Sequence, residues 1–333
     1  MTTMSEKNPK LSILIPSYNH ARFLPEAIES VLAQDFDDYE LLIRDDASTD
    51  DTRRVLEYYA KRDSRIRFSI NRVNAGMAQN WNLCIGEARG EYIKLLNSDD
   101  KLFTKDSLSK LAAMLDDNPS AVIACSARYL IDEDSNILEY WDSVGTAGLH
   151  KGHDIILRCL RENINIIGEP AVVLFRKRHA IQEFDIRFRQ ITDFVMWIHL
   201  LEQGDLVYTK EPLNVWRTHP NQQTKRNEVH KIGQHEFYTF LIEYINQPWI
   251  QARETREIVF NQIFTIRRHG SQWGDAKALE NRMIDELGRR FYITFYLYFM
   301  PPYIAKKAIN KCKRLARSIL VKLFQKKTGM PAA

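Results

Sequence analysis

The sequence lacks the glycine-rich signatures by which many proteins hold phosphate groups. No Gly-x-Gly occurs among its 13 glycines, which excludes the dinucleotide-binding fingerprint, and no Gly-Lys pair occurs, which excludes the Walker A loop. A protein of this sequence that binds phosphate therefore needs another positive partner. A divalent cation held by acidic side chains is the simplest substitute.

Cysteines and long apolar runs are also scarce. The four cysteines form no Cys-x-x-Cys pair and have no zinc-finger spacing, so we expect reduced thiols in a cytoplasmic protein. The opening residues, MTTMSEKNPK, contain no apolar segment typical of a secretory signal. No run of 18 or more apolar residues occurs, so the sequence predicts no membrane-spanning helix.

Positive charge is concentrated at one end of the chain. Residues 306–327 contain nine Lys or Arg and no acid, so a net charge of +4 leaves −5 for the remainder. A charge distribution of this kind does not indicate a nucleic-acid-binding surface, and we expect no nucleic-acid partner.

Apolar runs alternate with amphipathic segments over the first 130 residues. The pattern predicts four strands and three intervening helices, which is typical of a mostly parallel sheet covered by helices. Beyond about residue 230 only helical periodicity remains. We therefore predict an α/β domain over 1–225 and a helical extension over 226–333. The strands are expected at 11–15, 39–44, 66–70 and 91–96, and the helices at 22–34, 50–61 and 76–88.

Polar segments follow each predicted strand, where ligands bind in sheets of this kind. Asp99 and Asp100 come directly after the strand at 91–96. Because adjacent carboxylates repel each other, a Mg²⁺ or Mn²⁺ ion shared with a diphosphate would stabilise them, although an Asp pair also suits a turn or a helix N-cap. The acidic segment 44–52 likewise suits either a helix cap or an acceptor for the edge of a nucleobase.

Taken together, these segments resemble the family 2 glycosyltransferases, whose domain has the GT-A fold, a nucleotide-binding, Rossmann-like mixed sheet. Over about 90 residues the order and spacing match the family's P-x-Y-N, D-D-x-S-x-D, N-x-G and D-x-D elements. The matching segments here are Pro16–Asn19, Asp45–Asp50, Asn74–Gly76 and the acids that follow GEYIKLLNS.

The resemblance implies roles for these residues. Asp46 corresponds to the acid that binds the donor's base, and Pro16 and Tyr18 to the segment along base and ribose. Asp99 and Asp100 correspond to acids at the ribose and the metal. Because Asn97 replaces the leading Asp of D-x-D-D, either acid could be the direct ligand, and we favour Asp100. The donor-binding set is completed by Asn19, Asn74 and Gly76.

The second half of the chain carries fainter matches. Residues 166–177 resemble the strand region on the acceptor side. Residues 191–204 resemble the helix that carries the family's general base, here Asp193, with Thr192 in place of the preceding Glu; an N-cap role for Asp193 is the alternative. VWRTHPNQQT resembles the family's Y-R-x-H element, whose His, here His219, approaches the metal or diphosphate.

The resemblance implies an inverting transfer of a sugar from a nucleotide-diphosphate sugar, with UDP favoured as the nucleotide, to a hydroxyl of a glycan or lipid-linked acceptor. Mn²⁺ or Mg²⁺ is the expected cofactor. A non-catalytic nucleotide-sugar-binding module is an alternative. A sugar-nucleotide pyrophosphorylase fits less well, because PSYNHARF has no glycine where that class needs a glycine-rich loop.

Residues 303–327 predict an amphipathic helix with basic faces. Their apolar positions recur at helical spacing, while lysines and arginines occupy the remainder. Such a helix suits an anionic membrane surface, which would make the protein a peripheral membrane protein on the inner face of the plasma membrane. The alternative is a helix that packs on the domain and exposes its basic face.

Overall fold

The computed structural model describes residues 8–229, 232–269 and 276–287. The chain divides into two compact units, Met1–Gln262 and Ile263–Ala333, and each is described by itself. Helix α7, which spans the boundary predicted at residue 225, and helix α8, which lies beyond it, belong to the first unit. Where an independently folding domain ends therefore stays a prediction.

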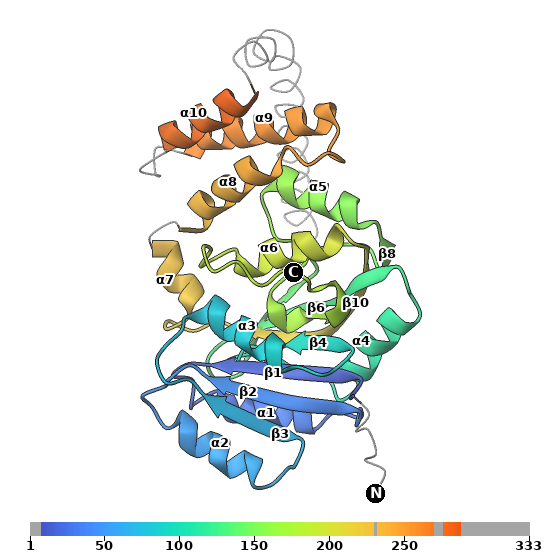
Figure 1. Ribbon diagram of the computed structural model, residues 1–333, viewed down its shortest axis with the longest axis vertical. Helices are drawn as coiled ribbons and strands as arrows, with labels where there is room; N and C mark the ends of the chain where they lie inside the picture. Colours follow the sequence, from blue (N-terminus) through green and yellow to red (C-terminus); the bar gives the residue numbers. More distant parts are fainter. Residues whose placement is uncertain (1–7, 230–231, 270–275, 288–333) are drawn as a thin grey trace, which may run out of the picture. The chain divides into compact units, whose positions relative to one another are not determined.

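The first unit is built on one mixed sheet with the strand order β3-β2-β1-β4-β9-β6-β10-β5 (Figure 1). Neighbouring strands from β3 to β4 pair in parallel, as do β6 and β10, and only β9 is reversed between them. The mixed α/β fold predicted from the sequence is confirmed. The strands are β1 (Leu11–Ser17), β2 (Tyr39–Asp45), β3 (Ile66–Ile70), β4 (Tyr92–Leu95), β5 (Lys101–Leu102), β6 (Ala121–Ile131), β7 (Ile137–Trp141), β8 (Gly148–His150), β9 (Val173–Arg176) and β10 (Asp205–Arg217).

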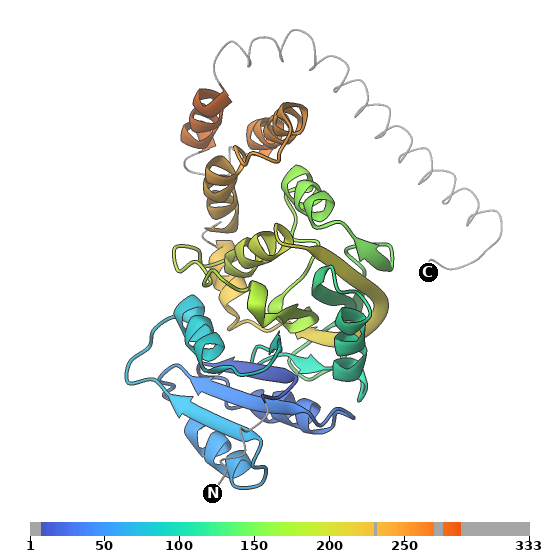
Figure 2. The same ribbon diagram turned by 45° about the vertical axis from the view of Figure 1, so that its right-hand side comes forward.

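Helices cover the sheet on both faces. Figures 1 and 2 show α3 on one side of β1 and β2, and α1 and α2 on the other. The described helices are α1 (Leu24–Leu32), α2 (Thr52–Ala60), α3 (Met77–Glu87), α4 (Ser107–Asp116), α5 (Gly152–Glu162), α6 (Thr192–Leu201), α7 (Gln223–Val229), α8 (Ile232–Tyr244), α9 (Ala252–His269) and α10 (Ala276–Leu287), with short 3-10 turns η1 (Pro170–Val172) and η2 (Lys177–His179).

The core lies where β1 is enclosed by neighbours on all sides. All seven residues of this strand are buried, as expected for an apolar run between two parallel partners. Ile13 and Ile15 share a core cluster with Ala27, Ile28 and Val31 of α1. Burial of these side chains fixes the register of β1, and so fixes which residues emerge at its carboxyl end.

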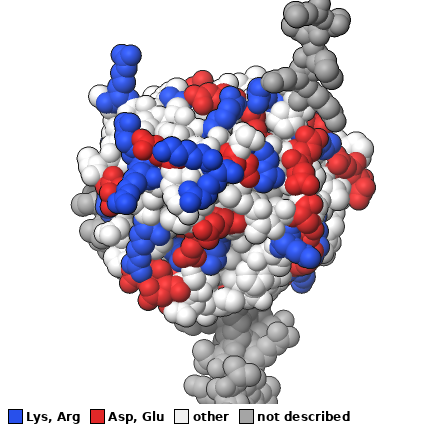
Figure 3. All heavy atoms as spheres, turned by 90° about the horizontal axis from the view of Figure 1, so that it is seen from below, with Lys and Arg blue, Asp and Glu red and all other residues white. Residues whose placement is uncertain are grey.

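Two further features bear on the predictions. Among the described residues, no helix combines the length and apolar character needed to cross a bilayer. On the face seen in Figure 3, Lys and Arg are interspersed with Asp and Glu and do not form one positive field. The segment 303–327, for which we expect a membrane-binding helix, lies outside the described residues.

Candidate active site

A cavity of about 950 Å³ opens where the carboxyl ends of the strands meet. It lies within the first unit, because its lining runs from Pro16 to Phe237. Asp100 and His219 are not among the lining residues. The predicted site residues that line the cavity are Pro16, Tyr18, Asn19, Asp46, Asn74, Gly76, Asp99 and Asp193.

Asp46 joins the end of β2 to the start of α3. Its carboxylate accepts hydrogen bonds from the amide nitrogens of Ala75 at 2.7 Å and Gly76 at 2.9 Å, and from the side chain of Asn71 at 2.7 Å. Asn74 donates to the backbone carbonyl of Asp46. Because a carboxylate has about four acceptor positions, one remains for a ligand. The helix-cap alternative concerns the later part of the same segment, where the carboxylate of Asp50 accepts a hydrogen bond from the amide of Thr52 at the start of α2, at 3.0 Å.

The loop after β1 is held in a conformation that few residues adopt. Asn19 has φ of 54°, in the left-handed region that asparagine tolerates better than most residues. The side-chain oxygen of Asn19 accepts a hydrogen bond from the backbone amide of Thr49, and the backbone amide of Asn19 donates one to the hydroxyl of Ser48. Tyr18 stays 44% exposed beside it and is free to contact a ligand along the cavity.

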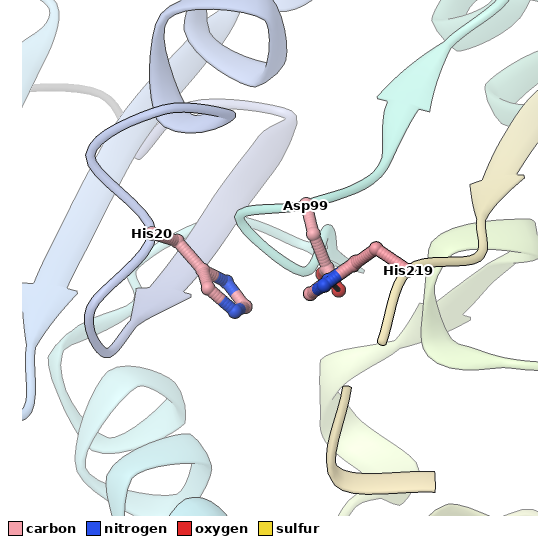
Figure 4. A group of neighbouring side chains, drawn as sticks. All are labelled: His20, Asp99 and His219. Carbon is pink, nitrogen blue, oxygen red and sulfur yellow. Dashed lines mark hydrogen bonds and ion pairs between the residues drawn. The ribbon is translucent and has the colours of Figure 1, made fainter. Parts of the chain in front are cut away.

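Asp99 meets two imidazoles from distant parts of the chain. His20 follows β1, Asp99 follows β4 and His219 follows β10, and their side chains point toward one another (Figure 4). The Nε2 atom of His219 lies 3.2 Å from a carboxylate oxygen of Asp99. One candidate ligand atom from each of the three residues lies within 4.8 Å of the others. Two nitrogens and one carboxylate oxygen suit a first-row divalent ion.

The two neighbouring aspartates have different surroundings. Asp100 faces inward, where it accepts from the backbone amide of Arg217 at 2.9 Å and from the side chain of Asn97 at 3.2 Å. Burial, followed by the negative charge of Asp99, raises the pKa of Asp100 well above its ordinary value. The pKa of Asp99 is lowered: burial acts against this, but the hydrogen bond from His219 and the charge of His20 outweigh it.

The turn that carries both aspartates is fixed by a buried guanidinium. Arg217 is fully buried, and its Nε donates to the backbone carbonyl of Asp99 at 2.7 Å. Its other nitrogens donate to the carbonyl of Asp132 and to the carboxylate of Glu26. Asp99 and Asp100 thus lie in a turn, as one alternative from the sequence had it, but Asp99 also reaches the cavity.

Asp193 lies in the first turn of α6 and lines the cavity. The N-cap of this helix is Ile191, so the alternative in which Asp193 caps the helix is wrong. Burial raises the pKa of Asp193 to about 7, and the nearby charge of Glu169 acts in the same direction, against a hydrogen bond from the amide of Phe194. A carboxylate with this pKa suits proton abstraction near neutral pH.

Glu169 links Asp193 to an arginine and two tryptophans. Its carboxylate lies 2.6 Å from Nε of Arg128, and Arg128 lies over the ring of Trp141, 5.0 Å from its centroid. The ring of Trp141 packs against that of Trp216, with centroids 5.3 Å apart and planes tilted by 36°. Glu169 and both tryptophans line the cavity.

Sequence analysis missed His20, Trp141 and Trp216 as site residues. His20 could have been found, because it directly follows Pro-Ser-Tyr-Asn at the edge where the strand-end rule places ligands. Trp141 lies in a stretch of sequence that carried no recognisable motif. Trp216 lies within the VWRTH segment, but the family resemblance of that segment concerns Arg217 and His219 and assigns no role to the tryptophan.

The chain is similar in sequence to known glycosyltransferases. Residues 12–180 match the profile of glycosyl transferase family 2. The putative teichuronic acid biosynthesis glycosyltransferase TuaG of Bacillus subtilis is 32% identical over 206 residues, which cover 62% of this chain and 77% of TuaG. A beta-1,3-glucosyltransferase of Campylobacter jejuni, named for a GalNAc-containing undecaprenol diphosphate, is 33% identical over 138 residues, or 41% of this chain and 43% of that protein.

Two solved structures share the fold. The S. aureus protein TarS in complex with UDP-GlcNAc has a TM-score of 0.67 at 17% identity, covering 85% of this chain and 82% of that one. A mannosyltransferase from Pyrobaculum calidifontis in complex with GDP-Man and Mn²⁺ has a TM-score of 0.55 at 13% identity, covering 93% and 81%.

The fold and the site define a glycosyltransferase of the GT-A class. Its mixed sheet carries acidic residues after the carboxyl ends of β2 and β4, as the sequence predicts, and the matched profile spans both strands. The chain belongs to glycosyl transferase family 2.

Proposed function

We propose that the protein transfers a sugar, with inversion, from a nucleotide-diphosphate sugar to a hydroxyl of a glycan or lipid-linked acceptor. One observation carries this proposal. Asp193, an acid of raised pKa, lines the same cavity as Asp99, which forms a cluster of possible metal ligands with His20 and His219. A UDP-sugar donor and a role in cell-surface glycan synthesis are supported by the names of TuaG and of the Campylobacter relative, and by the TarS complex.

The donor would lie along the strand ends from β2 to β4. Tyr18 and Asp46 would contact the base and ribose, because they line the cavity where β1 and β2 end. Asn19, Asn74 and Gly76 hold the loops that shape this part of the wall. Asp99 follows β4, two strands away from β2 in the sheet, and would lie near the diphosphate.

The two imidazoles and the carboxylate around Asp99 are suitable metal ligands for an Mn²⁺ or Mg²⁺ ion that would accompany the diphosphate. We assign His20, Asp99 and His219 as protein ligands, and replace our preference for Asp100, because the carboxylate of Asp100 accepts hydrogen bonds inside the turn. A bound ion would neutralise charge on the leaving diphosphate. Two imidazole nitrogens favour Mn²⁺ over Mg²⁺.

The reaction itself needs one base and one displacement. Asp193 would accept the proton of the acceptor hydroxyl, and the resulting oxygen nucleophile would form a bond to the anomeric carbon. The bond from that carbon to the diphosphate breaks, and its electron pair leaves with the diphosphate. Attack opposite the leaving group inverts the anomeric configuration. Burial is the main cause of the raised pKa of Asp193, and the charge of Glu169 would assist in the same direction.

An anionic membrane surface is proposed as a further partner of residues 303–327, and the support for it is their sequence pattern of apolar positions among lysines and arginines. Flotation of the full chain with liposomes of anionic or neutral lipid tests this partner. Equal flotation with both kinds of lipid would rule it out.

Calorimetric titration with nucleoside diphosphates, with Mn²⁺ or with EDTA, tests the donor and metal sites. We expect UDP to bind with Mn²⁺ and to bind at least tenfold more weakly with EDTA. Asp99→Asn should abolish this difference, whereas Asp100→Asn, the matched control one residue away, should retain it. If no nucleoside diphosphate binds, the proposed function is wrong; if Asp100→Asn alone loses the metal effect, the ligand assignment is wrong.

A further inference from the structure

Two tryptophans lie side by side on the wall of the cavity. Trp141 ends β7 and Trp216 comes near the end of β10, so they are 75 positions apart in sequence and meet only in the folded chain. Both are partly exposed, and both line the cavity. Indole rings are usually buried in a core, so a pair that keeps ring surface open to a cavity provides a ready apolar binding face.

Trp141 is held in place by two residues that do not line the cavity, Glu139 and Arg128. Its indole nitrogen donates to the carboxylate of Glu139 at 2.6 Å, and the guanidinium of Arg128 lies over its ring. Arg128 is itself held by Glu169 through an ion pair of 2.6 Å. A face fixed in this way loses little side-chain freedom when a ligand binds, which favours affinity.

The pair lies on the catalytic-base side of the cavity. In the sheet order, β4, which precedes Asp99, lies between β2, which precedes Asp46, and the strands β6 and β10. Trp216 lies on β10, and Trp141 lies on β7, which pairs with β6. Contacts continue from Trp141 through Arg128 to Glu169, whose charge acts on Asp193. A nucleotide base at β2 would therefore lie across the metal-binding cluster from the tryptophans, while the acceptor hydroxyl must reach Asp193.

We propose that Trp141 and Trp216 form the acceptor subsite, and that it takes a pyranose ring. The proposal rests on the proposed function. The C–H face of a pyranose is apolar and matches an aromatic face, while its hydroxyls point outward around the ring edge. Asn163, another residue that lines the cavity, adds a neutral side-chain amide that can hydrogen-bond to such hydroxyls. The acceptor's terminal unit is thus a ring sugar and not an open-chain polyol.

Saturation-transfer NMR with methyl pyranosides of glucose, galactose and N-acetylglucosamine tests the subsite in the full chain, with UDP and Mn²⁺ present. We expect transfer to the C–H protons of one ring face for at least one pyranoside, and none to ribitol. Trp141→Ala and Trp216→Ala should each weaken this binding about tenfold. The phenylalanine variants, which keep an aromatic face, should lose less.

Tyr140→Ala is the matched control. Tyr140 is the neighbour of Trp141 on β7, so it points to the opposite face of the sheet, where it is 46% exposed and pairs with Tyr129. It does not line the cavity, and we expect its replacement to leave pyranoside binding unchanged. Titration of every variant with UDP and Mn²⁺ shows whether the site has folded.

The outcomes separate the subsite from the function. If UDP binds but no pyranoside does, or if ribitol binds equally well, the acceptor subsite is refuted while the proposed function stands. If the tryptophan variants lose UDP-sugar affinity and donor hydrolysis to the same extent as pyranoside binding, the pair belongs to the donor and the proposal is wrong. If no nucleoside diphosphate binds the wild type, the failure is that of the proposed function.

Discussion

Asp193→Asn should make the protein less active and more stable at alkaline pH. Asparagine is nearly isosteric with aspartate but accepts no proton from an acceptor hydroxyl. General-base catalysis contributes about 10²–10⁴ in rate, so we expect turnover to fall by about that factor while UDP binding is retained. For the wild type, kcat/KM should rise about tenfold per pH unit below the pKa of about 7 and level off above it.

The effect on stability follows from the same pKa. Folding raises the pKa of Asp193 from 3.8 to about 7, so the folded protein holds this proton more tightly than the unfolded chain. The stabilisation is complete below the unfolded pKa and is lost as pH rises through the folded one. Between pH 5 and pH 8 a carboxyl with this pKa shift would lower the wild type's free energy of unfolding by about 2.7 kcal/mol. Because the side chain is partly exposed, we expect a loss of about 1–2 kcal/mol.

Urea unfolding of both proteins at pH 5 and pH 8 measures this difference. The free energy of unfolding of the asparagine variant, relative to that of the wild type, should be about 1–2 kcal/mol higher at pH 8 than at pH 5. Asp100, whose pKa is also raised, is present in both proteins and cancels in the comparison. Asp205→Asn is the matched control without a pH effect in this range. Hydrogen bonds from Lys151 and Ser120 outweigh burial and lower the pKa of Asp205, so its carboxyl is ionised in both the folded and the unfolded protein at pH 5 and at pH 8. A pH-independent difference for Asp193→Asn, or near-normal turnover, would refute the reasoning.

Three further substitutions test the surroundings of the site. Glu169→Gln removes a charge that raises the pKa of Asp193, so the acidic limb of the kcat/KM profile should move to lower pH; an unmoved limb would show that burial alone sets that pKa. Gly76→Ala meets no neighbouring atom within 4 Å but must adopt φ of +87°, and urea unfolding should show a loss of about 1–2 kcal/mol; no loss would mean that the loop relaxes. Arg217→Lys leaves buried acceptors at Asp99 and Asp132 unpaired and should cost about 3 kcal/mol by the same assay, whereas a cost below about 1 kcal/mol would show that water replaces the guanidinium.

Local sequence determined the first half of the fold and the part of the cavity proposed to bind the donor. The strands at 11–15, 39–44, 66–70 and 91–96 lie within a residue or two of β1 to β4, because buried apolar runs of this length between helical periods have few other structures open to them. Once these strands pair in parallel, their carboxyl ends share one edge. The polar segments after them, including Tyr18, Asp46 and Asp99, then had to line the same cavity.

Tertiary structure decided which side chains face one another. Asp99 and Asp100 are neighbours in sequence, and only the approach of the end of β10 gives them different partners. The backbone amide of Arg217 donates to Asp100, whereas the imidazole of His219 lies beside the carboxylate of Asp99. Trp141 and Trp216 meet for the same reason, at the ends of strands that pair with β6. Periodicity and spacing act over a few residues, whereas these contacts depend on the path of β10, whose Arg217 lies 117 positions after Asp100.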